Sequence, residues 1–386
     1  MKMRKLQADW LFDGYTLQKD KILILDEAGA VLDVITSLAP DNEIERFTGI
    51  LMPGMINCHC HLELSHLKNS IEPKKGLVDF LLSVIRLRKD KDEEQAKADA
   101  IVAAEKEMYE NGIVAVADIA NTADSAATKK TSLIQWHTLI EVINLWDANL
   151  EQAFSRFQSV QQVFERANLK AVITPHAPYS VSAATFKAIN EATAGRVISV
   201  HNQETAPENE LFEKGSGQFL EFYELITGKA HSPFATSGKS SLQTWLSHFT
   251  KGQTIILVHN TYTQEADIIW AKEHAAAHGL KLVFCLCPNA NQYIEDRLPP
   301  VDLLIKHNCH VVLGTDSYSS NWQLSIAKEL AILHEHFPQV PLATLLQWAT
   351  NNGADAIGWE RLGLFEKGKT PGVVLLQSDF SVQRLV

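Results

Sequence analysis

Two histidines lie two residues apart at the end of an apolar run, in the segment PGMINCHCHLELSHL, residues 53–67. In a β-strand, residues i and i+2 point to the same side. His59 and His61 can therefore face one metal ion together, while Cys58 and Cys60 face the opposite side. Because neutral imidazole is a common ligand of divalent transition metals, this pair predicts half of a metal site that needs further ligands from elsewhere in the chain.

Polar residues also follow several other apolar runs. They are His176 in TPHAPYS, His201 in RVISVHN, His259 in QTIILVHN and Asp316 in GTDS. Taken singly, a histidine at a strand end is more often a hydrogen-bonded core residue, and GTDS could be an ordinary turn. If they gather at one end of a fold, three imidazoles and a carboxylate form a donor set that suits a divalent ion such as zinc, with iron or manganese as alternatives. Such a site leaves a coordination position free for a water molecule.

The segments between these motifs follow a repeating pattern. Over residues 51–359, eight short apolar runs alternate with longer amphipathic segments. Helices are expected near residues 76–111, 125–136, 150–168, 182–193, 263–278, 299–307, 322–337 and 341–358. Eight strand–helix units predict an α/β fold of the (β/α)8 TIM-barrel type, whose active site lies at the C-terminal ends of the strands. All of the motifs above fall at those ends.

The two ends of the chain have a different pattern. Residues 5–50 contain short runs with a period near two, separated by Asp-Gly and Ala-Gly turns, and this predicts antiparallel strands. The C-terminal tail returns to strand-like sequence. We therefore expect residues 1–50 and 360–386 to form a small β-sandwich subdomain beside the barrel of residues 51–359.

Composition limits the partners and the compartment. The 386 residues carry a net charge of −11 without a Lys/Arg-rich run, which argues against nucleic acid as a partner. No run approaches the ~20 apolar residues of a membrane span, and no apolar targeting segment follows the basic N-terminus. Five cysteines, an odd number set in apolar runs, argue against a disulfide framework. We expect a cytoplasmic protein with reduced thiols, and the sequence leaves open whether it forms a homo-oligomer.

The motifs PGMINCHCHLE, HAPYS, VHNQE, LVHN and GTDS resemble, in type and order, the successive strand-end motifs of the amidohydrolase superfamily. The branch resembled contains guanine, cytosine, adenosylhomocysteine and aminodeoxyfutalosine deaminases together with chlorohydrolases. The resemblance implies a metal-dependent hydrolase with the ligands His59, His61, His201 and Asp316. It also implies catalytic roles for Glu204, His259 and Asp316 and a substrate contact for His176.

One difference from part of the superfamily concerns the number of ions. Members with two metal ions carry a carboxylated lysine at the end of the fourth strand. Here that place is occupied by Thr174, Pro175 and His176, and Lys170 lies at the other end of the strand. We therefore expect one divalent ion.

The expected chemistry follows from that ion. A bound divalent metal lowers the pKa of water from about 15.7 to about 7. Asp316 can both bind the metal and accept a proton, and His259 can hydrogen-bond the attacking oxygen. Glu204, three residues after a ligand, can carry the proton to a ring nitrogen and then to the leaving amine, a role worth about 10²–10⁴ in rate.

A different zinc-deaminase signature, H-x-E followed by P-C-x-x-C, is only half present. Residues 61–63 read HLE, but no P-C-x-x-C follows. Glu63 therefore has two open interpretations, a carboxylate that orients a metal histidine or one that contacts the substrate.

Substrate identity is less constrained. The region from His61 to the helix containing Phe80 and ending near Arg88 is similar to the aminodeoxyfutalosine deaminase pattern, and residues 205–240 could cover the site. We expect a small heterocyclic substrate, foremost a 6-aminopurine nucleoside derivative or a related amino-heterocycle that releases ammonia. The alternatives are hydrolysis of a cyclic amide or a carbon–halogen bond on the same scaffold, and a non-catalytic metal-binding protein.

Overall fold

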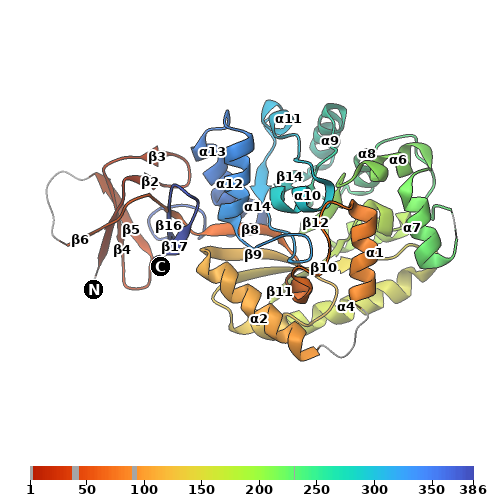
Figure 1. The fold of residues 1–386 in the computed structure, drawn as a ribbon, viewed down its shortest axis with the longest axis horizontal. Coiled ribbons are helices and arrows are strands. Elements are labelled where there is room, and N and C mark those ends of the chain that lie inside the picture. The colour runs from red at the N-terminus through yellow and green to blue at the C-terminus, as the bar shows by residue number, and fades with distance from the viewer. Residues whose placement is uncertain (1–2, 37–42, 89–93, 230) are drawn as a thin grey trace.

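The computed structural model describes residues 3–36, 43–88, 94–229 and 231–386. It consists of a large α/β body and a smaller lobe of strands that contains both chain ends (Figure 1). The large body holds the sequence motifs singled out above, and the small lobe lies to one side of it.

Two parallel four-stranded sheets form the centre of the large body. The first has the order β11-β10-β9-β8, and the second has the order β12-β13-β14-β15. Their bounds are β8 Met55–Cys60, β9 Ile113–Ala120, β10 Gln135–Val142, β11 Lys170–Pro175, β12 Val197–Asn202, β13 Thr254–His259, β14 Lys281–Leu286 and β15 Val311–Leu313. Nearly every residue in these strands is buried, as expected for parallel strands covered by helices. The predicted α/β class with eight strands in this order is confirmed.

The outer strands of the two sheets contact each other on both sides. Between β11 and β12, the His201 N–H donates to the carbonyl of His176 at 3.0 Å. Between β8 and β15, the backbone N–H groups of Thr315 and Asp316 both donate to the carbonyl of His59 at 3.0 Å. These contacts bring the C-terminal ends of strands from different sheets to the same place.

Helices follow the strands as the pattern predicts, with a few corrections. The helices are α1 Leu77–Leu87, α2 Glu94–Glu110, α3 Ala126–Thr131, α4 Leu150–Arg166, α5 Ala183–Ala192, α6 Ala206–Lys214, α7 Gln218–Thr227, α8 Ser241–Trp245, α9 Glu265–His278, α10 Pro288–Glu295, α11 Val301–Lys306, α12 Ile326–His336, α13 Leu342–Ala349 and α14 Asn351–Ile357. The single helix expected over 76–111 is two helices, α1 and α2, and residues 89–93 lie outside the described part. The single helix expected over 341–358 is also two helices, α13 and α14. Helix α10 was not expected, because PNANQYIE has no apolar periodicity and only Pro288 in its first turn indicates a helix start.

The small lobe contains two further sheets, with the orders β17-β16-β7-β2-β3 and β5-β4-β1-β6. Their bounds are β1 Arg4–Gln7, β2 Trp10–Phe12, β3 Leu17–Gln18, β4 Lys21–Leu25, β5 Val31–Thr36, β6 Ile44–Arg46, β7 Ile50–Pro53, β16 Val373–Leu376 and β17 Val382–Arg384. The C-terminal β16 pairs antiparallel with β7, as the sequence predicts. The pairs β1–β6 and β2–β7 are parallel, so the expectation of purely antiparallel strands is wrong there. Buried residues of both sheets, such as Leu23 and Val373, share one hydrophobic cluster.

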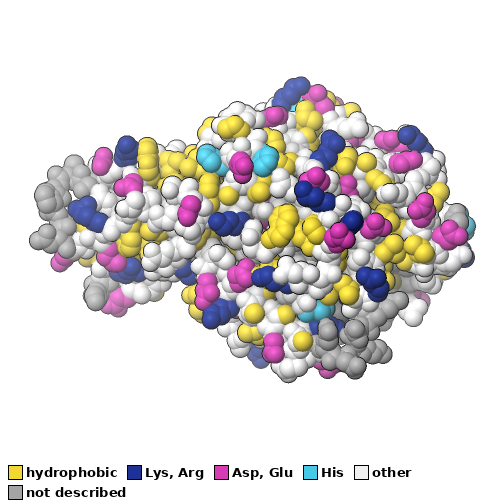
Figure 2. All heavy atoms as spheres, viewed as in Figure 1, with side chains coloured by type: hydrophobic (Ala, Val, Ile, Leu, Met, Phe, Trp, Pro, Cys, Tyr) yellow, Lys and Arg dark blue, Asp and Glu magenta, His cyan; other side chains and the backbone are white. Residues whose placement is uncertain are grey.

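The surface carries charges of both signs. On the face drawn in Figure 2, acidic and basic side chains of the described residues are interspersed rather than separated into patches. None of the helices in the described ranges combines the length and the apolar character that crossing a membrane requires.

Candidate active site

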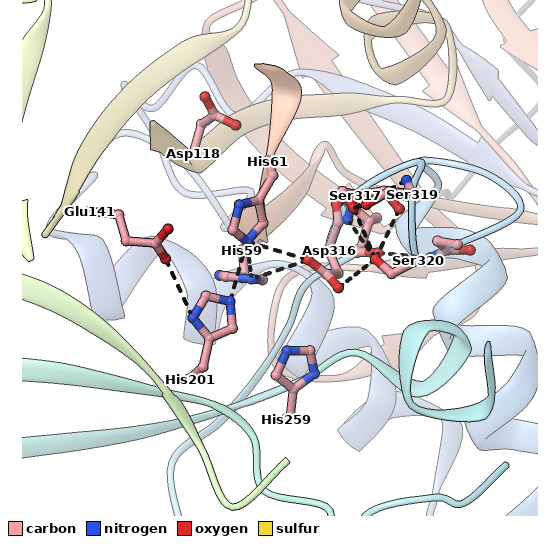
Figure 3. A network of polar contacts seen from close by, with 12 residues as sticks. His59, His61, Asp118, Glu141, His201, His259, Asp316, Ser317, Ser319 and Ser320 are labelled. Atoms are coloured by element: carbon pink, nitrogen blue, oxygen red, sulfur yellow. Dashed lines mark hydrogen bonds and ion pairs between the residues drawn. The ribbon is translucent and has the colours of Figure 1, made fainter. Parts of the chain in front are cut away.

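Three histidines and one aspartate converge where the two large sheets meet (Figure 3). The Nε2 atom of His61 lies 3.2 Å from the Nε2 atoms of both His59 and His201. Asp316 Oδ1 lies 3.5 Å from the Nε2 atoms of His59 and His61. The ligand atoms of all four residues lie within 4.8 Å of one another, and all four side chains are buried. The residues expected to bind metal are therefore brought together.

The spacing of these atoms fits a small divalent cation. Two nitrogens bound tetrahedrally at about 2.0–2.1 Å from zinc are separated by about 3.3 Å, close to the 3.2 Å seen here. Without a cation, the nitrogen lone pairs would face one another in a buried space. The donor set of three imidazoles and one carboxylate is one that zinc accepts.

Burial keeps the histidines in the form that binds metal. It lowers the pKa of His59 to about 3 and that of His201 to about 4, in both cases assisted by neighbouring histidines. At neutral pH these rings are uncharged, as metal ligation requires. His201 Nδ1 lies 2.9 Å from the His176 carbonyl. A proton on Nδ1 would donate to that oxygen and leave Nε2 with its lone pair directed at the cluster.

The backbone changes conformation where two of the site residues leave their strands. His259 has φ of 73° and Asp316 has φ of 58°, which are left-handed conformations that non-glycine residues adopt at a cost of order 1 kcal/mol. They redirect both side chains toward the cluster. Ser320 Oγ donates to Asp316 Oδ2 at 2.5 Å and fixes the carboxylate. Asn57 adds support, because its amide bonds both the N–H of Thr315 (3.1 Å) and its hydroxyl (2.7 Å).

Glu204 lies next to this cluster. Its Oε1 is 3.5 Å from His259 Nε2. Burial raises the pKa of Glu204 well above its usual range, and the negative charge of Asp316 raises it further. Glu208, which the sequence did not single out, accepts hydrogen bonds from the backbone N–H groups of Gln203 (2.8 Å) and Glu204 (3.2 Å). Burial raises the pKa of Glu208 to about 7.

Glu63 shows neither of the two arrangements considered for it. Its Oε2 accepts hydrogen bonds from the backbone N–H groups of Asn121 and Thr122, each at 3.0 Å, and from the Thr122 hydroxyl at 2.9 Å. Its Oε1 accepts a hydrogen bond from Arg88. The carboxylate therefore holds Arg88 and the loop after β9, rather than a metal histidine, and it is not among the residues that line the cavity described next.

A cavity of about 910 Å³, including the part open to solvent, leads to the cluster. One wall is apolar and comes from α1 and α7, through Phe80, Val84, Phe222 and Ile226 among others. The opposite wall is polar and comes from strand ends, with Arg88 reaching it from the end of α1. Its residues are Arg88, Asn121, Glu141, His176 and Ser180. An apolar wall facing a few polar groups is the usual composition of a small-molecule site.

Glu141, at the end of β10, was missed by the sequence reasoning. It lies inside the apolar run HTLIEVINL, where a carboxylate is unusual, and this was the available signal. Burial raises its pKa to about 6. Glu141, His176 and His201 form a second group whose atoms could hold a metal. However, His201 Nδ1 is already hydrogen-bonded to the His176 carbonyl.

Parallel strands with a histidine–aspartate cluster at their C-terminal ends place this chain in the class of metal-dependent hydrolases. Residues 50–385 match the amidohydrolase family, and the chain belongs to that family. The resemblance inferred from the strand-end motifs is confirmed.

Several relatives in this family are deaminases. Aminodeoxyfutalosine deaminase of Nitratiruptor sp. is 26% identical over 93% of this chain and 87% of its own length. The structure of Helicobacter pylori aminofutalosine deaminase in complex with methylthio-coformycin superposes with a TM-score of 0.78 at 21% identity, covering 97% of this chain and 92% of that one. A zinc-bound adenosine deaminase from Xanthomonas campestris gives a TM-score of 0.72 at 21% identity, covering 97% and 84%.

Proposed function

We propose that this protein is a mononuclear metal-dependent deaminase that acts on an aminopurine nucleoside derivative or a related amino-heterocycle and releases ammonia. The observation that carries the proposal is the convergence of four ligand atoms, with Glu204 and His259 beside them, at the end of a cavity that has one apolar and one polar wall. His59, His61, His201 and Asp316 would hold the ion, and zinc suits their donor atoms.

When bound, the ion supplies polarisation of a water molecule and lowers its pKa. The water oxygen bonds to the ring carbon that carries the amine. Glu204 carries a proton to the adjacent ring nitrogen, and its raised pKa suits that role. His259 hydrogen-bonds the attacking oxygen, and Asp316 accepts the second water proton. That proton passes to the amine as the carbon–nitrogen bond breaks, so ammonia leaves and the oxygen stays on the ring carbon as a carbonyl. His176 contacts the heterocycle.

We also propose a closed architecture for the large body. The contacts of β11 with β12 and of β8 with β15 support an eight-stranded barrel that comprises residues 51–359. The shared hydrophobic cluster of the two smaller sheets supports a β-sandwich made by residues 1–50 and 360–386.

The names of the relatives support an adenosine-like substrate over the alternatives. A test is ammonia release from aminopurine nucleosides, with and without 5′ substituents, by metal-replete protein of measured zinc content. We expect ammonia in proportion to substrate consumed. Ring opening or halide release without ammonia would instead support the cyclic-amide or carbon–halogen hydrolase, and zinc binding without any hydrolysis would support a non-catalytic protein.

A further inference from the structure

We propose that Glu141 binds a sugar hydroxyl group of the substrate and selects ribonucleosides over deoxynucleosides. This inference rests on the proposed function, because it assumes that the ring to be hydrolysed lies over the metal-binding cluster. Glu141 is near the C-terminal end of β10 and lies on the polar wall of the cavity, and Figure 3 shows its carboxylate directed toward His201.

The first step in the argument is the hydrogen bonding of the Glu141 carboxylate. Its side chain is 3% exposed. Oε2 accepts a hydrogen bond from Asn121 Nδ2 at 3.0 Å. Oε1, although buried, receives no hydrogen bond from the described residues. An unpaired carboxylate oxygen in a buried site is costly, so a donor is expected from whatever occupies the cavity.

The second step concerns His201, the group nearest to this oxygen. His201 Nδ1 lies 3.5 Å from Glu141 Oε1 but 2.9 Å from the His176 carbonyl. The carbonyl is at hydrogen-bond distance and the carboxylate is not. His201 is therefore already oriented by the backbone, and Glu141 is not needed for that purpose.

Arg88 lies on the same wall of the cavity, but its hydrogen bonds go to residues other than Glu141. Its Nη1 donates to Asn121 Oδ1 at 2.9 Å, and its Nη2 donates to Glu63. No hydrogen bond joins the guanidinium to Glu141 Oε1 among the described residues. A group that occupies the cavity can therefore supply the missing donor, and a hydroxyl of the ligand is such a group.

The position of Glu141 indicates which part of a ligand that donor belongs to. Ligand atoms of Glu141, His176 and His201 lie within 4.8 Å of one another. A group bound to Glu141 is thus next to a heterocycle held at the cluster. In a nucleoside, the neutral O–H donors at that distance from the ring are the ribose hydroxyls, and a carboxylate is a strong acceptor for them.

The test combines a protein change with a substrate change. Values of kcat/KM for adenosine, 2′-deoxyadenosine and 3′-deoxyadenosine are measured for the parent protein, for Glu141→Met and for Glu141→Gln, all at equal zinc content. Loss of a hydrogen bond to a charged group corresponds to about 10- to 100-fold. We expect the parent to prefer adenosine over one deoxy substrate by about that factor, and Glu141→Met to slow adenosine while leaving that deoxy substrate nearly unaffected.

Two results would overturn the inference. One is a parent protein that treats all three nucleosides alike. The other is a Glu141→Met variant that slows all three equally or loses zinc, since Glu141 would then act through His201. Glu141→Gln, which keeps the shape, guards against a folding defect in the methionine variant, and Glu335→Gln on the exposed side of α12 is the matched control.

A calorimetric titration separates this inference from the proposed function. If no nucleoside is deaminated, the same three compounds are titrated into the parent and into Glu141→Met. Tighter binding of adenosine to the parent alone would support Glu141 as a hydroxyl receptor even though deamination had failed. Equal or undetectable binding of all three would contradict it.

Discussion

Glu204 differs from the neighbouring carboxylate Asp316 in its relation to the cluster. Asp316 contributes an oxygen to the group of ligand atoms, whereas Glu204 is 3.5 Å from His259 and outside that group. Burial and the charge of Asp316 raise the pKa of Glu204, so it holds a proton more readily than an exposed glutamate does. A group of this kind suits proton transfer better than metal binding.

The change Glu204→Gln tests this role. The amide keeps the shape of the side chain but cannot transfer the proton, so we expect kcat to fall by about 10²–10⁴-fold. Zinc content and thermal stability should be unchanged, since Glu204 is not one of the proposed ligands. Elemental analysis gives the zinc content and ammonia release gives kcat, both measured on the same sample of the variant. A variant that turns over at the parent rate would remove Glu204 from the mechanism.

The sequence predicted the histidines of the site better than their supporting residues. His59 and His201 could be found because each ends an apolar run, and the fold brings such ends together. The apolar run around Glu141 marks that carboxylate as unusual, but the roles of Glu141 and Glu208 could not be assigned, because they depend on which atoms these side chains face. The same holds for Glu63, because its partner Arg88 is 25 residues away in the chain and contacts it only in the folded protein.

At the scale of elements, β15 approaches β8 closely because Gly314 has no side chain. A Cβ there would lie 2.8 Å from His59 Cβ and 2.9 Å from Cys285 Sγ, which is too close. We expect Gly314→Ala to push β15 away and to displace Asp316. Zinc affinity should fall at least about tenfold, and the free energy of unfolding by about 1–3 kcal/mol.

The control for that change is Gly358→Ala. This glycine has φ of 76° at the end of α14, with open space around it. Alanine there should cost about 1 kcal/mol of stability without altering zinc affinity. Equal zinc affinity in the parent and Gly314→Ala, measured by competition with a chelator, would show that the close approach does not position the ligands.

Helix α12 carries a buried carboxyl group, that of Glu329, whose contribution to the stability of the fold depends on pH. Glu329 accepts hydrogen bonds from Asn289 N and Asn321 Nδ2, both at 2.9 Å, and so connects α12 to α10 and to the loop after β15. Burial nevertheless raises its pKa to about 8. The unfolded chain releases this proton near its ordinary pKa of about 4.3, while the folded chain keeps it. The protonated carboxyl group therefore stabilises the fold fully below about pH 4.3, and this stabilisation is lost as the pH rises through the folded-state pKa of about 8.

We therefore expect the Glu329 contribution to stability to decrease by an amount on the order of a few kcal/mol between pH 5 and pH 8. Urea denaturation of the metal-free parent and of Glu329→Gln across this range measures it. The difference in free energy of unfolding should shift in favour of the variant as the pH rises. A difference that is constant with pH would mean that Glu329 is ionised in the folded protein.

For the whole molecule, the cluster joins two sheets that are separate in their strand pairing. His59 and His61 belong to β8 or follow it directly, whereas His201 belongs to β12 and Asp316 follows β15. An ion bound to all four residues would link the two sheets. The sequence predicted the order of the strands, because each is a buried apolar run, but the side-chain contacts that join them depend on the three-dimensional arrangement.

Removal of the metal should therefore lower global stability. A ligand present at a thousandfold its Kd stabilises the folded state by about 4 kcal/mol, so we expect chelation to lower the Tm by several degrees and added zinc to restore it. His61→Ala should show no zinc-dependent shift. The same Tm in the parent with and without chelator would contradict a link between the two sheets.

The most direct test of the central claim is a zinc titration of metal-free protein, followed by ammonia release from adenosine. If one ion held by His59, His61, His201 and Asp316 supports deamination, ammonia release is absent at the start. It then rises in proportion to added zinc and levels off at one zinc per chain. Full activity without metal, a plateau at two zinc ions per chain, or zinc binding with no ammonia from any aminopurine nucleoside would contradict the account.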